Sequence, residues 1–158
     1  MRFVADRMLG RLARWLRMLG FDTAYPADVG DRELARLARA RGAVLLTRDT
    51  ELAAARGVRT LLVHSDHLAE QLAQVGLELD LPLELPSYGR CAECNEPLRP
   101  CERENARDRV PEHVYYAHDD FAECPACLRV YWKGSHWRSA RRALGGQAAE
   151  SPLPDGGE

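Results

Sequence analysis

Four of the five cysteines form two C-x-x-C pairs on either side of residues 95–123: Cys91 with Cys94, and Cys124 with Cys127. Each pair places two sulfur atoms on one tight turn, and two facing turns supply the four thiolates of a tetrahedral zinc site. Four cysteine ligands leave no open coordination position, so the predicted role of this Zn²⁺ is structural. The alternative is disulfides or redox motifs, which we disfavour because the chain shows no signal peptide for an oxidising compartment.

Acidic residues follow two predicted strands. The apolar run at 3–5 leads into Asp6, and the run at 43–46 leads through Thr47 to Asp49. The carboxyl ends of neighbouring parallel strands meet at one edge of the sheet, where ligands bind. A helix beginning near Asp31 would bring Asp31 and Glu33 to the same edge. Clustered carboxylates repel one another unless a cation lies between them, and all-oxygen ligands favour Mg²⁺ or Mn²⁺.

Helix capping is a simpler explanation for each of these acids. Asp31 follows Gly30 where an N-cap is expected, and Asp6 and Asp49 each precede a predicted helix. Asp66 could be a fourth ligand, although a cap is the favoured role. The hydroxyl of Thr47 could orient a carboxylate or a water. The sequence leaves the choice between capping and catalysis open.

A basic stripe begins beside Asp6. Arg7, Arg11 and Arg14 fall within about 60° of one another on an ideal helix, opposite a row of leucines. A solvated helix face would look the same. Next to an acidic metal cleft, however, a polyanionic substrate needs positive flanks, which favours a track for phosphates.

Alternating strands and helices must position these groups. Apolar runs predict strands at 3–5, 21–25, 43–46 and 60–63, and helical periodicity predicts helices at 7–19, 32–41, 51–55 and 66–75. This order predicts an α/β fold with a parallel central sheet and helices on both faces. Prolines make 81–86 an extended connector. The long segment between the cysteine pairs must carry structure of its own or protrude.

Motifs across residues 1–140 resemble the Mut-seven C-terminal RNase domain, a branch of the PIN-like ribonucleases. In the first half these are the strand ending at Asp6, then Met8-Leu9-Gly10-Arg11-Leu12-Ala13-Arg14-Trp15-Leu16-Arg17, Gly20-Phe21-Asp22-Thr23 and Leu45-Leu46-Thr47-Arg48-Asp49. In the second half they are Arg90-Cys91 with Cys94, Val110-Pro111, Phe121, Cys124 with Cys127, and Val130-Tyr131-Trp132-Lys133-Gly134-Ser135-His136.

The resemblance implies a PIN-like three-layer sandwich over residues 1–86, a small zinc ribbon over 87–140, and metal-dependent cleavage of RNA. The tail at 141–158 is expected to be disordered. Acids of the PIN type match Asp6 and Asp49. The acid at the start of the second helix fits Asp31 better than Glu33, and Asp66 is the nearest candidate for a fourth acid.

RNA is the expected partner. Tryptophan faces can stack on unpaired bases, and basic groups can hold phosphates, although His136 could equally be a packing residue of the ribbon. The candidate contacts are Arg7, Arg11, Arg14, Arg48, Trp132, Lys133, His136 and Trp137.

Other functional classes fit less well. No apolar run is long enough to cross a membrane, so a cytoplasmic protein without a membrane partner is expected. A receiver-like switch would need a lysine after a late strand of the sheet, whereas Lys133, the single lysine, lies in the predicted ribbon. A non-catalytic RNA-binding module remains the main alternative. The sequence also leaves open the role of Cys101, read as a spare thiol, and whether the chain forms a homo-oligomer.

Overall fold

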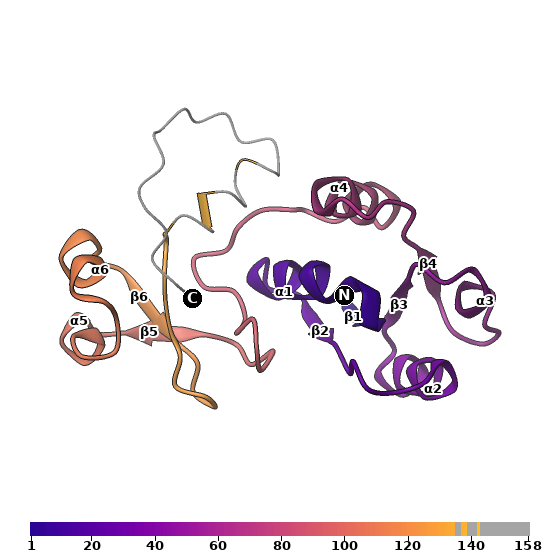
Figure 1. The fold of residues 1–158 in the computed structure, drawn as a ribbon, viewed down its shortest axis with the longest axis horizontal. Helices are drawn as coiled ribbons and strands as arrows, with labels where there is room; N and C mark the ends of the chain where they lie inside the picture. The colour runs from indigo at the N-terminus through magenta and orange to yellow at the C-terminus, as the bar shows by residue number, and fades with distance from the viewer. Residues whose placement is uncertain (135–136, 139–141, 143–158) are drawn as a thin grey trace.

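The computed structural model describes residues 1–134, 137–138 and 142. Its first part is a parallel sheet, as predicted (Figure 1). The strand order in this sheet is β2-β1-β3-β4. The strands are β1 (Arg2–Ala5), β2 (Asp22–Ala24), β3 (Val44–Thr47) and β4 (Thr60–Leu62). The chain runs from β1 outward to β2 and then returns to β3 on the other side of β1. Strand order therefore reverses between β1 and β3, the place where α/β sheets bind ligands.

Helices cover both faces of this sheet, which gives the expected three layers. They are the short 3₁₀ helix η1 (Arg7–Leu9), α1 (Gly10–Met18), α2 (Asp31–Arg41), α3 (Thr50–Ala53) and α4 (Leu68–Glu78). The predicted first helix begins as a 3₁₀ turn, and the fourth begins at Leu68 rather than at residue 66. Gly42 ends α2 at φ 58°, a left-handed conformation that glycine adopts without steric cost.

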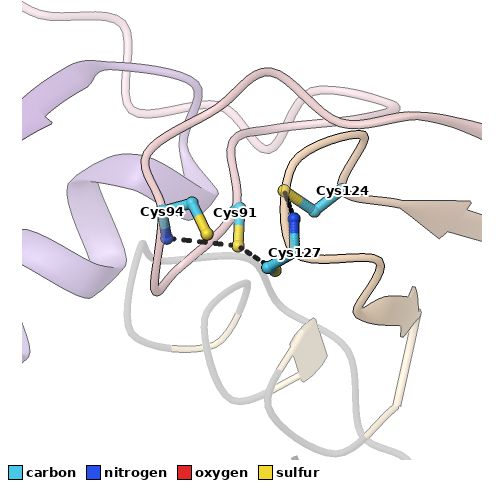
Figure 2. Close-up of side chains that lie close together, drawn as sticks. All are labelled: Cys91, Cys94, Cys124 and Cys127. Atoms are coloured by element: carbon cyan, nitrogen blue, oxygen red, sulfur yellow. Dashed lines mark hydrogen bonds between the residues drawn. The ribbon is translucent and has the colours of Figure 1, made fainter.

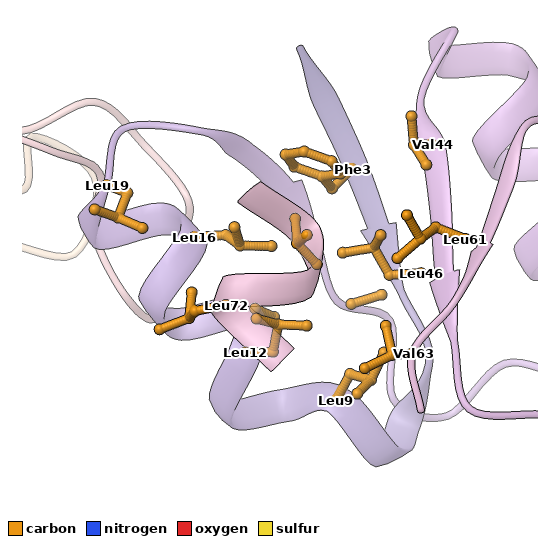
Figure 3. Close-up of a cluster of buried hydrophobic side chains, with 13 residues drawn as sticks. Phe3, Leu9, Leu12, Leu16, Leu19, Val44, Leu46, Leu61, Val63 and Leu72 are labelled. Carbon is orange, nitrogen blue, oxygen red and sulfur yellow. The ribbon is translucent and has the colours of Figure 1, made fainter. Parts of the chain in front are cut away.

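Alternation along the strands divides the core into two layers. Phe3 and Leu46 face α1 and α4, where they join Leu12, Leu16 and Leu72 (Figure 3). Val4 and Leu45 point the opposite way and pack with Leu34, Ala38 and Leu52 of α2 and α3. Because successive strand residues point to opposite faces, a strand covered on both sides is apolar throughout.

The second part is a small antiparallel ribbon with its own core. Strands β5 (Arg99–Cys101), β6 (Phe121–Glu123) and β7 (Val130–Trp132) pair in the order β5-β6-β7. The long segment between the cysteine pairs carries α5 (Arg103–Ala106) and α6 (Glu112–Ala117). Of the two alternatives left open by the sequence, internal structure is therefore the one found. Phe121, Val114 and Ala106 form the centre of this core, and Cys101 is buried beside them rather than exposed.

The connector after α4 lies against the first part instead of spanning solvent. Leu81, Leu83 and Leu85 all pack on the core beneath α1 and α4. Gly89 then passes the end of α1 so closely that a Cβ atom there would lie 2.1 Å from the Met18 carbonyl oxygen. Only glycine fits such an approach, which indicates that the two parts meet in one defined arrangement.

A buried arginine joins the two parts. Arg17 of α1 is 7% exposed, and its guanidinium donates hydrogen bonds to the carbonyls of Thr23, Ala92 and Glu93. Asn95 strengthens the junction, because its side-chain oxygen accepts from the Thr23 N–H at 2.9 Å and its amide donates to Asp22 at 2.7 Å. The first cysteine turn is therefore attached to α1 and β2.

The division at residues 86 and 87 stays a prediction, since the connector contacts both parts. The predicted tail at 141–158 lies outside the described residues, apart from Arg142. Among the described residues, no helix is long and apolar enough to cross a bilayer.

Candidate functional site

The four paired cysteines converge on one point between the two parts of the chain (Figure 2). Their sulfur atoms all lie within 4.8 Å of one another, and Cys91 Sγ is 3.7 Å from Cys127 Sγ. Cys91 and Cys124 are buried, whereas Cys94 and Cys127 are exposed. Four thiols at this spacing form a group that could hold a metal such as zinc.

The two cysteine turns have the same backbone geometry. In each turn the second cysteine donates its N–H to the sulfur of the first, at 3.3 Å for Cys94 and 3.5 Å for Cys127. The residue that follows is left-handed in both, Asn95 at φ 65° and Leu128 at φ 65°. Such a conformation is costly for leucine and persists only when its surroundings impose it. The two turns thus present their sulfurs in the same way, and together they bring four sulfurs to one point.

Hydrogen bonds favour the thiolate of Cys91. Burial opposes its ionisation, but the Tyr131 hydroxyl, 3.0 Å from the sulfur, and the Cys94 N–H outweigh burial and lower the pKa of Cys91. The neighbouring sulfurs act in the opposite direction on Cys94, whose pKa is raised to about 12, first through its hydrogen bond with Cys127. A cation among the sulfurs is the physical condition under which all four could ionise together.

We expect Tyr131→Phe to weaken zinc binding about 10- to 100-fold, the usual effect of losing an outer-sphere hydrogen bond to a metal ligand. The Tyr131 hydroxyl accepts from the Ala92 N–H at 3.1 Å, so its own hydrogen is directed to Cys91. Competition with a chromophoric chelator measures the affinity. Tyr116→Phe, a change at a side chain that is 66% exposed in the same module, is the matched control. Equal affinities in the two variants would contradict the prediction.

The second candidate group lies at the carboxyl edge of the parallel sheet. Asp6 is 5% exposed, and its Oδ2 accepts hydrogen bonds from the Thr47 hydroxyl and from the Arg48 N–H at 3.1 Å. The Thr47 hydroxyl in turn accepts from the Asp49 N–H at 3.0 Å. Thr47 thus connects the segment after β1 with the segment after β3, at the position where strand order reverses.

The capping explanation is correct for two of the acids. Asp6 accepts from the Met8 N–H at 2.9 Å as N-cap of η1, and Asp49 accepts from the N–H groups of Glu51 and Leu52 as N-cap of α3. Capping alone does not account for the bonds of Asp6 to Thr47, the last residue of β3, and to Arg48, which follows it.

The remaining acids are arranged differently. The N-cap of α2 is Gly30, without a side-chain hydrogen bond, so Asp31 is an exposed residue of the first helical turn and not its cap. Glu33 is hydrogen-bonded to Arg36 on the same helix, at 2.9 and 2.5 Å. Asp66 is exposed, 3.5 Å from His67 Nε2, and His67 rather than Asp66 is the N-cap of α4.

The acids do not converge as the cysteines do. Among the described residues, only the four cysteines form a group of three or more potential metal ligands, and their sulfur atoms lie within 4.8 Å of one another. Asp6, Asp31 and Asp49 therefore stay a predicted set of ligands. Mg²⁺ commonly uses only one or two carboxylates and keeps several waters, so a tighter cluster is not required for its binding.

A large cavity lies between α1 and the ribbon, with a volume of about 1130 Å³. We call it the junction groove. Five of the eight predicted RNA contacts line it: Arg11, Arg14, Trp132, Lys133 and Trp137. Arg7 is exposed at the start of η1, and Arg48 lies at the acidic edge, with Nη2 3.5 Å from the His64 carbonyl. His136 lies outside the described residues.

Sequence reasoning did not identify Arg17 and Tyr131, two residues that connect the cysteine group to the rest of the fold. Arg17 lies in a helical motif and Tyr131 in a strand, and no spacing rule pairs either with a cysteine many residues away. One signal was available for Arg17: it falls next to the leucine row of the first helix and not on the exposed stripe, and an arginine near a buried face needs partners.

One of the comparisons with known proteins identifies a family. No curated protein and no solved structure matches the chain. A family model described as the Mut7-C RNAse domain matches residues 1–144, which include the parallel sheet, both cysteine turns and the segment between them. The chain therefore belongs to the Mut7-C RNAse domain family.

Proposed function

We propose that this chain is a divalent-metal-dependent ribonuclease that hydrolyses RNA phosphodiester bonds at the edge formed by Asp6 and Asp49, with Asp31 of α2 as the third metal ligand. Membership of an RNase domain family suggests the ribonuclease type of activity. The location of the site is supported by the Thr47 hydroxyl, which donates to Asp6 and accepts from the Asp49 N–H where the strand order reverses. That position is the usual ligand site of such sheets.

The donor set fits a hard cation. Asp6, Asp31 and Asp49 offer carboxylate oxygens without nitrogen or sulfur, the ligands that Mg²⁺ and Mn²⁺ prefer. When bound, such an ion would lower the pKa of a coordinated water and neutralise charge that builds up on the phosphate.

The chain's own residues orient the site. The Thr47 hydroxyl at the end of β3 and the N–H of Arg48, the next residue, both donate to one oxygen of Asp6 and so orient this carboxylate before substrate binds. The Glu51 and Leu52 N–H groups hold one oxygen of Asp49 in the same way. Arg48 brings a positive charge to this edge, where a phosphate would need one.

The cysteine group is assigned a structural Zn²⁺ in this proposal. Four thiolates leave no position for substrate, and their excess negative charge lies close to the buried guanidinium of Arg17. The ribbon would then assist by holding RNA rather than by taking part in the chemistry.

The test is metal-dependent cleavage of a labelled RNA. Zinc-loaded protein should cut the RNA with added Mg²⁺ or Mn²⁺ and should stop when these ions are chelated. The same rate in excess chelator would contradict the proposal. Binding of RNA without cleavage in the presence of either metal would instead favour a non-catalytic RNA-binding module. In such a module Asp6 and Asp49 would serve only as helix N-caps, a role for which both already form hydrogen bonds.

A further inference from the structure

All three tryptophans of the chain, Trp15, Trp132 and Trp137, line the junction groove. They come from α1, from β7 and from the segment after β7, so the fold gathers them from distant parts of the sequence. Trp132 and Trp15 each pack at the margin of a hydrophobic core and are only partly buried. Partly buried aromatic faces in a cavity are the usual surface on which unpaired bases stack.

The groove is also positively charged. Six basic side chains line it against two acids, Glu93 and Asp120, a formal excess of four positive charges in a chain whose net charge is -2. The basic residues are Arg11, Arg14, Arg90, Arg109, Arg129 and Lys133. Aromatic faces together with excess positive charge fit a nucleic-acid single strand, because its phosphates meet the basic groups while its bases remain free to stack.

Both acids of the groove are paired with groove cations. Glu93 forms an ion pair with Arg14 between the first cysteine turn and α1, and Asp120 lies 3.3 Å from Lys133 Nζ. These are partly exposed pairs, which are weak on their own and would exchange readily for phosphates. Neutralising either acid should therefore strengthen the attraction of the groove for a polyanion.

The first helix connects the groove to the carboxyl edge of the parallel sheet, where Asp6 and Asp49 lie. Asp6 is the N-cap of η1, and the chain continues directly into α1, on which Arg11 and Arg14 reach the groove. From Asp6 to Arg14 the helical rise amounts to roughly 14 Å. A nucleic-acid single strand bound in the groove could therefore follow a short, positively charged surface past Arg7 to the proposed cleavage site.

We propose that the junction groove binds a segment of single-stranded RNA, with bases stacked on its tryptophans and phosphates on its arginines, and that α1 leads this strand to Asp6 and Asp49. This inference rests on the proposed ribonuclease function and specifies its substrate class. Because one wall comes from α1 and the other from the ribbon, binding requires both parts of the fold.

Intrinsic tryptophan fluorescence tests the proposal without cleavage, in buffer lacking Mg²⁺ and Mn²⁺. The probe is an unstructured RNA of about 16 nucleotides, the upper end of usual single-strand sites. It should bind with a change in fluorescence, and a perfect RNA duplex of the same length should bind much more weakly. Equal binding of duplex and single strand, or binding without a fluorescence change, would overturn the proposal.

Charge variants test the groove in opposite directions. Glu93→Gln and Asp120→Asn should each tighten single-strand binding several-fold. Arg129→Gln should weaken it and reduce the slope of log affinity against log salt by about 0.7, the value expected for one lost contact to a single-strand phosphate. Glu96→Gln removes the same charge from an exposed residue near the first cysteine turn that does not line the groove. If Glu93→Gln behaves as Glu96→Gln does, the proposal is wrong.

Stacking is tested at Trp132. Trp132→Leu keeps an apolar side chain against the ribbon core and should weaken binding by about 5- to 150-fold, the range for loss of one stacked base. Trp132→Phe keeps an aromatic face and should retain most of the affinity. Full affinity in the leucine variant would overturn the stacking part of the proposal. These experiments measure RNA binding and not cleavage. A protein that binds single-stranded RNA in the groove but does not cut it would contradict only the proposed ribonuclease function. A protein that cuts RNA but does not bind it in the groove would contradict only the inference about the groove.

Discussion

Asp49→Asn is expected to reduce RNA cleavage by more than about 100-fold while leaving the fold unchanged. Asparagine is as good an N-cap as aspartate, so its amide oxygen can still accept from the Glu51 and Leu52 N–H groups. The substitution thus removes one negative charge and little else. Even outer-sphere partners of a metal commonly change activity 10- to 100-fold, so a direct ligand should exceed that range.

Asp6→Asn is expected to abolish cleavage as well, but with a cost in stability. Both carboxylate oxygens of Asp6 accept hydrogen bonds: Oδ1 from the Met8 N–H, and Oδ2 from the Thr47 hydroxyl and the Arg48 N–H. In either orientation, the amide of asparagine would place its N–H₂ group against a backbone N–H, that of Met8 or that of Arg48. Loss of the repulsion between the acids stabilises the folded variant, whereas a buried donor without an acceptor reduces the free energy of unfolding by about 1–3 kcal/mol. We expect the second effect to dominate, because Asp6 is buried and Asp49 is exposed.

Single-turnover cleavage with saturating Mn²⁺ and thermal unfolding together measure these effects. Asp108→Asn makes the same chemical change at an exposed residue of the ribbon, and it should cut RNA at the wild-type rate. Wild-type cleavage by Asp49→Asn, at normal stability, would remove this residue from the proposed site. The combination of the two aspartate variants separates a loss of charge from a loss of structure.

Loss of the proposed zinc site is the second change for which we expect a large effect. Cys91→Ser or Cys124→Ser should unfold the ribbon, because metal binding contributes about 10–16 kcal/mol to modules of this kind and each of these sulfurs is buried. The parallel sheet should survive. It should nevertheless lose stability near the end of α1 and β2, because Arg17 and Thr23 bond directly to the first cysteine turn.

Hydrogen exchange read out by segment distinguishes these regions, and metal analysis gives the zinc content per chain. Cys101→Ser is the matched control, since Cys101 is also a buried cysteine of the ribbon but lies outside the cysteine group. It should retain about one zinc per chain. A Cys91→Ser protein with an intact, protected ribbon would contradict a structural role for zinc.

Much of the architecture could be predicted from local patterns. Apolar runs that end in an acid, such as residues 3–6, identify strands buried on both faces, because period-two alternation and helical spacing are properties of neighbouring residues. The cysteine turns were equally clear, since a C-x-x-C pair determines its own geometry. Boundaries were less certain: the fourth helix begins at Leu68, two residues later than expected, with His67 as its N-cap.

The sequence by itself determined which residues could do chemistry: two thiol pairs, acids after two strands, and a basic stripe on the first helix. Only the tertiary structure decided how they are combined. It placed Thr47 between Asp6 and Asp49, buried Arg17 against the first cysteine turn, and gathered Trp15 and the tryptophans of the ribbon in one groove. These arrangements depend on strand order and on the docking of the ribbon, which arise from contacts between residues far apart in the chain and leave no periodic signal in it.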